Sequence, residues 1–380
     1  MRAAVMTREY PPEVYGGAGV HVEYLVRELE RLIDVEVRCF GAPRDGANAY
    51  QAWPALADAN AALQTISVDL LMAASAGVDL VHSHTWYANL AGHLAKLLHD
   101  VPHVATTHSL EPERPWKREQ LGDGGYALSC FCERTGLEGA DAVVAVSGAM
   151  RDDVLRVYPA IDAERVHVIH NGIDPDEYRP DRGTYALERY GVDPARPSVV
   201  FVGRITHQKG VTHLLDAGGS IDAQAQLVLA AGAPDTEELA RETESKVARL
   251  REERGGIVWI EKMLERSEVV QLLTHATVFV CPSVYEPLGI VNLEAMACET
   301  AVVASAVGGI PEVVEDGVTG LLAPPADPDA LATAVNELVA DPERARQMGV
   351  AGRRRAVEQF SWRAVAERTA ELYEQLVARV

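Results

Sequence analysis

Cysteine is scarce in this sequence and never closely paired. Five cysteines occur among 380 residues, and none forms a C-x-x-C pair. Cys130 and Cys132 have no second pair of ligands at a spacing that suits zinc. These absences exclude a disulfide framework and favour a reducing compartment. We therefore expect a cytoplasmic protein whose thiols are ordinary packed side chains.

Long hydrophobic runs are also absent. The longest apolar stretches, such as residues 198–202, end far short of the ~20 residues that span a bilayer. Residues 1–10 contain no apolar core of a signal peptide. We therefore expect no membrane partner.

Positive charge is in deficit. Lysine and arginine together number 35 against 56 acidic residues, which gives a net charge of −21. So acidic a chain disfavours nonspecific binding to nucleic acids or to anionic lipids. A phosphorylated ligand would need a site at which cations gather locally. The composition defines no oligomeric state, and a homodimer remains a candidate.

Short apolar runs alternate with helical periods along the whole chain. A stretch rich in turn residues, 171–183, divides this alternation into two series. The expected strands are residues 3–6, 35–40, 80–82, 104–107, 142–146 and 166–169, then 198–202, 226–230, 257–260, 278–281 and 301–304. The pattern predicts an α/β chain with two doubly wound, Rossmann-like domains, each with a parallel sheet covered on both faces.

The predicted domains are residues 1–170 and residues 196–358, joined by a linker over 171–195. Residues 359–380 form a final helix, which Ser361 can cap. Ligands of such sheets bind outside the carboxyl ends of the strands. Two facing domains would therefore form a cleft between those ends.

Two cations follow the first strand of the second half. Arg204 leaves the carboxyl end of the strand, and Lys209 stands at the expected start of the next helix, where the helix dipole disfavours a cation. A bound diphosphate would explain both, because guanidinium and ammonium groups bind phosphate oxygens. The alternative is a pair of solvated surface cations.

Glu286 and Glu294 are eight positions apart around the expected helix 289–297. On an ideal helix this spacing gives roughly 80° of rotation and 12 Å of rise, so the carboxylates cannot share a proton. They would instead reach different parts of one elongated ligand. Taken alone, either acid is more often a surface or helix-terminal charge.

The helix N-terminus between these acids offers an anion site through the N–H groups of Leu288, Gly289 and Ile290. A carboxylate can accept hydrogen bonds from both hydroxyl groups of a vicinal diol. A ligand with a diol at each end and phosphates between them is a nucleoside diphosphate sugar. Glu294 would bind the ribose and Glu286 the transferred sugar.

A glycine pair lies near the N-terminus. Gly16 and Gly17 precede a helix, but the connection from the first strand is too long for a dinucleotide fingerprint and the third glycine is missing. Glycines at a helix start can expose N–H groups to an anion. The alternative is a flexible loop.

Histidines and a cationic loop follow two other strands. His84 and His108 stand at expected strand ends, although a lone histidine there is more often structural. Arg114, Lys117 and Arg118 crowd the segment after His108. This segment is either an exposed charged loop or the receptor for an anionic acceptor.

These motifs together resemble the retaining glycosyltransferases of the GT-B type. The Glu-x7-Glu motif, the Gly-Arg-x4-Lys-Gly run and the Gly-Gly loop occur in the order of that family. Within it, the chain is most similar to the actinobacterial glycogen synthase and α-maltose-1-phosphate synthase group, through residues 7–21, 82–87 and 114–122. One departure is Val14-Tyr15, where longer bacterial glycogen synthases have a lysine before the glycine pair.

The resemblance implies ADP-glucose as donor, no metal cofactor, and a final helix that crosses back onto the first domain. It also implies front-face attack with retention, in which Arg204 and Lys209 stabilise the leaving diphosphate and His108 lies near the transferred sugar.

The cations after His108 favour glucose 1-phosphate as acceptor and α-maltose 1-phosphate as product. Elongation of an α-glucan by a glycogen synthase is the alternative. A sugar-nucleotide epimerase and a noncatalytic sensor share the architecture. A glycoside hydrolase would need both carboxylates at one bond, about 5–10 Å apart, which the helix geometry disfavours.

Overall fold

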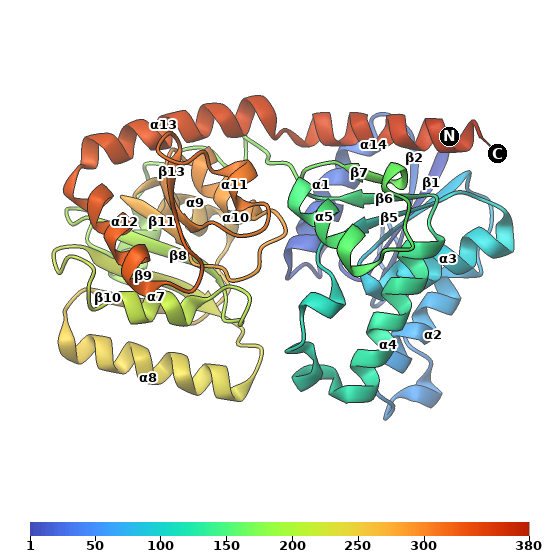
Figure 1. The fold of residues 1–380 in the computed structure, drawn as a ribbon, viewed down its shortest axis with the longest axis horizontal. Coiled ribbons are helices and arrows are strands. Elements are labelled where there is room, and N and C mark those ends of the chain that lie inside the picture. Colours follow the sequence, from blue (N-terminus) through green and yellow to red (C-terminus); the bar gives the residue numbers. More distant parts are fainter. Residues whose placement is uncertain (380) are drawn as a thin grey trace. The chain divides into compact units, whose positions relative to one another are not determined.

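The computed structural model describes residues 1–379, which form two compact units (Figure 1). Unit 1 comprises Met1–Asn171 together with the chain from Trp362 onward, and unit 2 comprises Gly172–Ser361. The expected linker, residues 171–195, lies almost entirely in unit 2, where it contains helix α6 (Tyr185–Tyr190).

Unit 1 is built on a parallel sheet of seven strands in the order β3-β2-β1-β4-β5-β6-β7. The strands are β1 (Arg2–Thr7), β2 (Asp34–Phe40), β3 (Asn48–Tyr50), β4 (Leu80–His84), β5 (His103–Thr107), β6 (Ala142–Ala145) and β7 (Val166–Val168). The central strands β4, β5 and β6 are buried at every residue. Burial on both faces explains why they read as unbroken apolar runs.

Helices cover both faces of this sheet. They are α1 (Gly17–Leu29), α2 (Ala61–Ala73), α3 (Trp86–His99), α4 (Lys117–Gly139), α5 (Gly148–Val157) and α14 (Trp362–Val377). Successive strand residues face opposite sides. Ala3 accordingly joins the core formed with α1 and α14, and Ala4 joins the core formed with α2 and α3.

Helix α14 belongs to unit 1 and lies beside α1 (Figure 1). Trp362 stacks on Tyr24 of α1 with ring centroids 5.5 Å apart and an interplanar angle of 3°. Farther along α14, the buried hydroxyl of Tyr373 lies 2.5 Å from Nδ1 of His82 on β4. The end of the chain therefore contributes directly to the core under the central strands.

Unit 2 contains a parallel sheet of six strands in the order β10-β9-β8-β11-β12-β13. Its strands are β8 (Ser198–Arg204), β9 (Gln226–Gly232), β10 (Ile257–Ile260), β11 (Val278–Cys281), β12 (Ala301–Ser305) and β13 (Gly320–Ala323). Besides α6, its helices are α7 (Val211–Ala217), α8 (Glu237–Glu253), α9 (Arg266–Thr274), α10 (Ile290–Ala297), α11 (Ile310–Val313), α12 (Pro328–Ala340) and α13 (Pro342–Gln359).

Both sheets reverse their strand order once. In unit 1 the reversal lies between β1 and β4, and in unit 2 between β8 and β11. Helices on either side of such a point diverge and leave a crevice outside the carboxyl ends of the strands. The residues that follow these four strands are therefore the first candidates for a ligand site.

Among the helices of residues 1–379, none combines the length and apolar composition that a bilayer span requires.

A close approach of α13 to the turn after α10 depends on a glycine. A Cβ added at Gly349 would stand 2.0 Å from the carbonyl oxygen of Glu299. We expect Gly349→Ala to lower the free energy of unfolding by about 2 kcal/mol, because the backbone must move to relieve the overlap. Gly255→Ala, where an added Cβ meets open space, is the control. Equal denaturation midpoints for both variants would contradict this packing.

Candidate functional site

Arg204 is the last residue of β8 and is paired within unit 2. Its guanidinium donates to Oδ1 of Asp235 at 2.6 Å. The N–H of Asp235 donates in turn to the carbonyl of Ile205 at 3.0 Å, which fixes the acid beside the strand end. A guanidinium carries five N–H donors, so one carboxylate contact leaves others for a ligand.

Lys209 lies in the turn that precedes α7, two residues before the helix begins at Val211. Gly210 gives this turn its left-handed conformation, with φ +61°, and a Cβ there would be 2.1 Å from the carbonyl oxygen of Pro282. The turn therefore packs directly against the loop that follows β11. This packing places Lys209 next to Glu286, which lies in the same loop.

Lys209 and Glu286 form an ion pair across the order reversal of the sheet. Nζ of Lys209 lies 2.6 Å from Oε2 of Glu286, and the hydroxyl of Ser283 donates to the same oxygen at 3.1 Å. Burial disfavours the charged amine, but the surrounding negative charge, led by Glu286, outweighs it and raises the pKa of Lys209. Lys209 is therefore a persistent positive centre at neutral pH.

A glycine pair after β12 fixes the backbone of Glu286. The N–H of Gly309 donates to the carbonyl of Glu286 at 3.0 Å. Gly308 has φ +57°, and a Cβ there would lie 2.0 Å from the same carbonyl oxygen. Only glycine permits this approach. The sequence carried a signal for it, since two glycines in a row follow the end of a strand.

The helix α10 begins at Ile290, and Gly289 precedes it as N-cap with φ +91°. Glu286 therefore lies in the loop, so the rotation and rise expected for two residues of one helix do not describe this pair. Glu294 stands within α10, where burial raises the pKa of its carboxyl group. Leu288 is buried in the turn before the helix.

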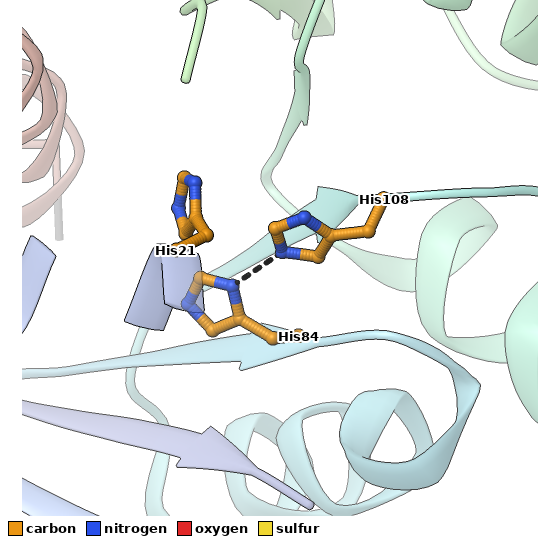
Figure 2. Close-up of side chains that lie close together, drawn as sticks. All are labelled: His21, His84 and His108. Atoms are coloured by element: carbon orange, nitrogen blue, oxygen red, sulfur yellow. Dashed lines mark hydrogen bonds between the residues drawn. The ribbon is translucent and has the colours of Figure 1, made fainter. Parts of the chain in front are cut away.

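In unit 1, three histidines from different elements converge (Figure 2). His21 comes from α1, His84 ends β4, and His108 directly follows β5. Nδ1 of His84 and Nε2 of His108 are hydrogen-bonded at 3.0 Å, and the ring of His21 meets that of His108 edge-on at 4.6 Å. The predicted His84 and His108 are thus neighbours, and His21 joins them without having been singled out from the sequence.

These rings are neutral at pH 7. Burial lowers the pKa of His21 to about 4, although its hydrogen bond to Asn171, at 2.6 Å, opposes the shift. Burial likewise lowers the pKa of His84 and His108. Neutral imidazoles can bind hydroxyl groups as donors or acceptors, and they add no positive charge to this region.

The histidine cluster is also the group in the described residues that comes nearest to a metal site. The ligand atoms of His21, His84 and His108 lie within 4.8 Å of one another, and three imidazoles can hold zinc. However, metal-bound histidines usually direct their second nitrogen to a carboxylate, carbonyl or water. Here His84 and His108 bind each other, and the expectation of no metal stays a prediction.

The glycine loop before α1 binds a carboxylate of its own chain. Oε2 of Glu9 accepts hydrogen bonds from the N–H of Gly16, at 2.8 Å, and of Tyr15, at 3.1 Å. Gly17 is the first residue of α1. Glu9 therefore holds this loop in place, and the assignment of Gly16 and Gly17 to the donor stays a prediction.

The three cations predicted for the acceptor have different surroundings. Arg114 donates to Ser109 at 3.1 Å and lies 3.5 Å from Glu111, so it is committed within unit 1. Lys117 and Arg118 lie in the first turn of α4, not in a loop. The nearest carboxylate to Arg118, that of Asp123, is 3.9 Å away.

Comparison with known proteins identifies the family. A model described as Glycosyltransferase Family 4 matches residues 15–177, and one described as Glycosyl transferases group 1 matches residues 187–355. An α-maltose-1-phosphate synthase of Mycolicibacterium smegmatis is 60% identical over 390 residues, with 100% of each chain covered. The chain belongs to the GT-B glycosyltransferases.

The glycosyltransferase is also 30% identical to a glycogen synthase of Mycobacterium tuberculosis, with 98% of this chain and 94% of the relative covered. The solved structure of a sucrose-phosphate synthase from Thermosynechococcus elongatus matches with a TM-score of 0.82 and 26% identity, and 100% of each chain is covered. The predicted GT-B fold and glycosyltransferase class are thereby confirmed.

Sequence reasoning missed the partners that position the predicted residues of the glycosyltransferase. Asp235, Ser283 and Glu9 are ordinary polar residues of loops, and no local pattern marks them. His21 lies on the buried face of an amphipathic helix, where histidine is unremarkable. Arg8, which directly follows the first strand, was not singled out from the sequence either.

The buried histidines predict an acid-sensitive enzyme. Unfolded histidine binds a proton near pH 6.5, whereas folded His21 does so only near pH 4. Between pH 6.5 and pH 4 the unfolded state therefore binds more protons than the folded state. The contribution of buried His21 to the free energy of unfolding is fully present above pH 6.5 and falls as the pH drops toward 4. We expect His21→Gln to remove about 2 kcal/mol of the difference in unfolding free energy between pH 7 and pH 5.

Urea denaturation at both pH values measures this difference. The exposed His207, changed to glutamine, serves as control and should keep the wild-type pH dependence. If both variants lose stability on acidification as the wild type does, burial of His21 is not its source.

Proposed function

We propose that the enzyme transfers glucose from ADP-glucose to glucose 1-phosphate, with retention of configuration, and releases α-maltose 1-phosphate and ADP. The observation that carries the proposal is the 60% identity, over the full length of both chains, to a protein named α-maltose-1-phosphate synthase. The glycosyltransferase class makes the epimerase and sensor hypotheses unnecessary.

The donor would bind at the order reversal of the unit 2 sheet. Arg204 and Lys209 carry the positive charge there, and their carboxylate partners hold them in position before a ligand arrives. We assign the diphosphate to these two cations and to the N-terminus of α10 at Leu288, Gly289 and Ile290. Preorganised charges of this kind stabilise a developing negative charge at little reorganisation cost.

Glu286 and Glu294 would bind the two sugars of the donor. Glu294, half-buried on α10, is assigned to the ribose, and Glu286 to the transferred glucose. In the reaction the bond from C1 to the diphosphate oxygen breaks while the bond to the acceptor hydroxyl oxygen forms on the same face. The hydroxyl proton passes to the leaving diphosphate. Neutral His108 would act as a hydrogen-bond partner of the glucose.

An assay of both acceptors tests the proposed function. We expect purified enzyme with ADP-glucose to release ADP rapidly when glucose 1-phosphate is added, and slowly with glycogen. NMR of the product should show an α-linked disaccharide phosphate. EDTA should leave the rate unchanged, because no metal is expected to take part.

The named relatives define the competing outcome. Glycogen synthase, represented by the M. tuberculosis relative at 30% identity, is the second candidate. Extension of glycogen without consumption of glucose 1-phosphate would overturn the acceptor assignment and establish that candidate.

A pair of lysine variants tests the donor site. Lys209→Met is expected to raise the activation free energy of transfer by about 2–4 kcal/mol, because it removes a positive charge from the leaving diphosphate. Lys246→Met is the matched control, since Lys246 on α8 also pairs with carboxylates, those of Asp216 at 2.7 Å and Glu242 at 3.0 Å.

Single-turnover rates with ADP-glucose measure both variants. The side chains are similarly shielded, 26% exposed for Lys209 and 18% for Lys246, so their effects on folding should be comparable. Wild-type turnover in Lys209→Met would remove this residue from the site.

A further inference from the structure

Unit 1 contains a pocket that none of the roles assigned so far uses. It has a volume of about 570 Å³, within the range of roughly 300–1,000 Å³ typical of small-molecule sites. Its lining includes Arg8, Phe40, Tyr50, Gln64, Trp86 and Tyr87. Aromatic faces, a cation and amide groups therefore border one concave space.

The position of the pocket follows from the sheet topology. Arg8 follows β1, Phe40 and Tyr50 end β2 and β3, and Trp86 opens the helix after β4. The carboxyl ends of four adjacent strands thus meet there, and the order reversal between β1 and β4 lies among them. This is the place at which a doubly wound sheet binds its ligand.

Arg8 was not singled out from the sequence, and its surroundings differ from those of Arg204, Lys209 and Arg114. Its guanidinium lies 4.2 Å from the centroid of the Tyr87 ring and 5.6 Å from that of Tyr15. Among residues 1–379 it has these ring contacts but neither a hydrogen bond nor an ion pair. Arg204, Lys209 and Arg114 all have carboxylate neighbours. In a chain of net charge −21, an unpaired guanidinium at a pocket indicates an anionic ligand.

The wall of the pocket next to Arg8 is aromatic, and the core residue Trp86 supports it from behind. Trp86 and Tyr87 have ring centroids 4.1 Å apart, and Nε1 of Trp86 is a buried donor without a partner. Thr85, just before them, adopts φ +62° and ψ 168°, a conformation that β-branched residues rarely take. Such strain concentrates at ligand sites, because the surrounding fold must impose it.

We propose that this pocket binds the acceptor as a sugar phosphate, with the phosphate on Arg8 and the sugar ring beside Tyr87. The assignment rests on the proposed function, which requires an anionic acceptor. A neutral glucan could accept hydrogen bonds from the guanidinium but would leave its charge uncompensated. The pocket also gives the acceptor phosphate a partner that Arg114, committed to Glu111 and Ser109, does not offer.

Calorimetric titration of the full-length enzyme with glucose 1-phosphate, in the presence of ADP, tests the proposal. Arg8→Gln is expected to weaken binding by about tenfold or more, because one charge-assisted contact is lost. The KM for glucose 1-phosphate should rise equally, and the KM for ADP-glucose should stay within twofold.

The matched control is Arg27→Gln. Arg27 also stacks on a tyrosine of unit 1, 4.6 Å from the centroid of Tyr24, but it lies outside the pocket, so binding should be unchanged. A second variant, Ala52→Trp, places bulk in the pocket lining and should abolish binding. It tests the same site should Arg8→Gln fail to fold.

The outcomes separate this assignment from the proposed function. If the wild type forms maltose 1-phosphate and both pocket variants bind glucose 1-phosphate normally, the pocket assignment is overturned and the function stands. If the wild type extends only glucan but binds glucose 1-phosphate through Arg8, the function fails and the pocket stands. Absence of binding to the wild type overturns both.

Discussion

The ion pair between Lys209 and Glu286 is the interaction on which the arrangement of unit 2 depends. An amine and a carboxylate that are largely withdrawn from water are tolerated only when each compensates the other. Their 2.6 Å contact requires the turn at Gly210 to pack against Pro282 and the glycines 308 and 309 to close on the Glu286 backbone. The ion pair therefore requires glycine at these positions, because a larger residue would keep Lys209 and Glu286 apart.

At the other predicted anion sites, too, a carboxylate of the chain itself binds the positive or N–H groups. Asp235 binds Arg204, and Glu9 accepts the N–H groups at the glycine loop. Each carboxylate stands where a ligand oxygen was expected and keeps the donors in a defined position. A diphosphate would then meet preformed geometry, which is the condition for electrostatic stabilisation without large reorganisation. Arg8 is the contrasting case, since aromatic rings, not an acid, hold it in place.

Most of the fold was predictable because parallel strands buried on both faces appear as unbroken apolar runs. The exceptions have a physical cause. The edge strand β3 is three residues long and half-exposed, and β13 is short with two of its four residues only partly buried, so neither produces such a run. The helix α6 lies among turn residues, which hid it within the expected linker. Residues at strand ends, such as Arg204 and His108, were predictable for the same reason that the strands were.

The sequence by itself determined where the buried strands lie along the chain and which groups stand at their carboxyl ends. It also determined the excess of acidic residues, against which each local cation is informative. Only the tertiary structure decided which of those cations are paired. Arg204 meets its partner 31 positions away and Lys209 meets Glu286 77 positions away, so contact depends on how loops pack after the sheet has formed. A hydrogen-bonded ion pair requires its charged atoms to lie within about 4 Å of each other. No local pattern could therefore distinguish the paired Arg114 from Arg8, which lacks an acidic partner and faces a pocket.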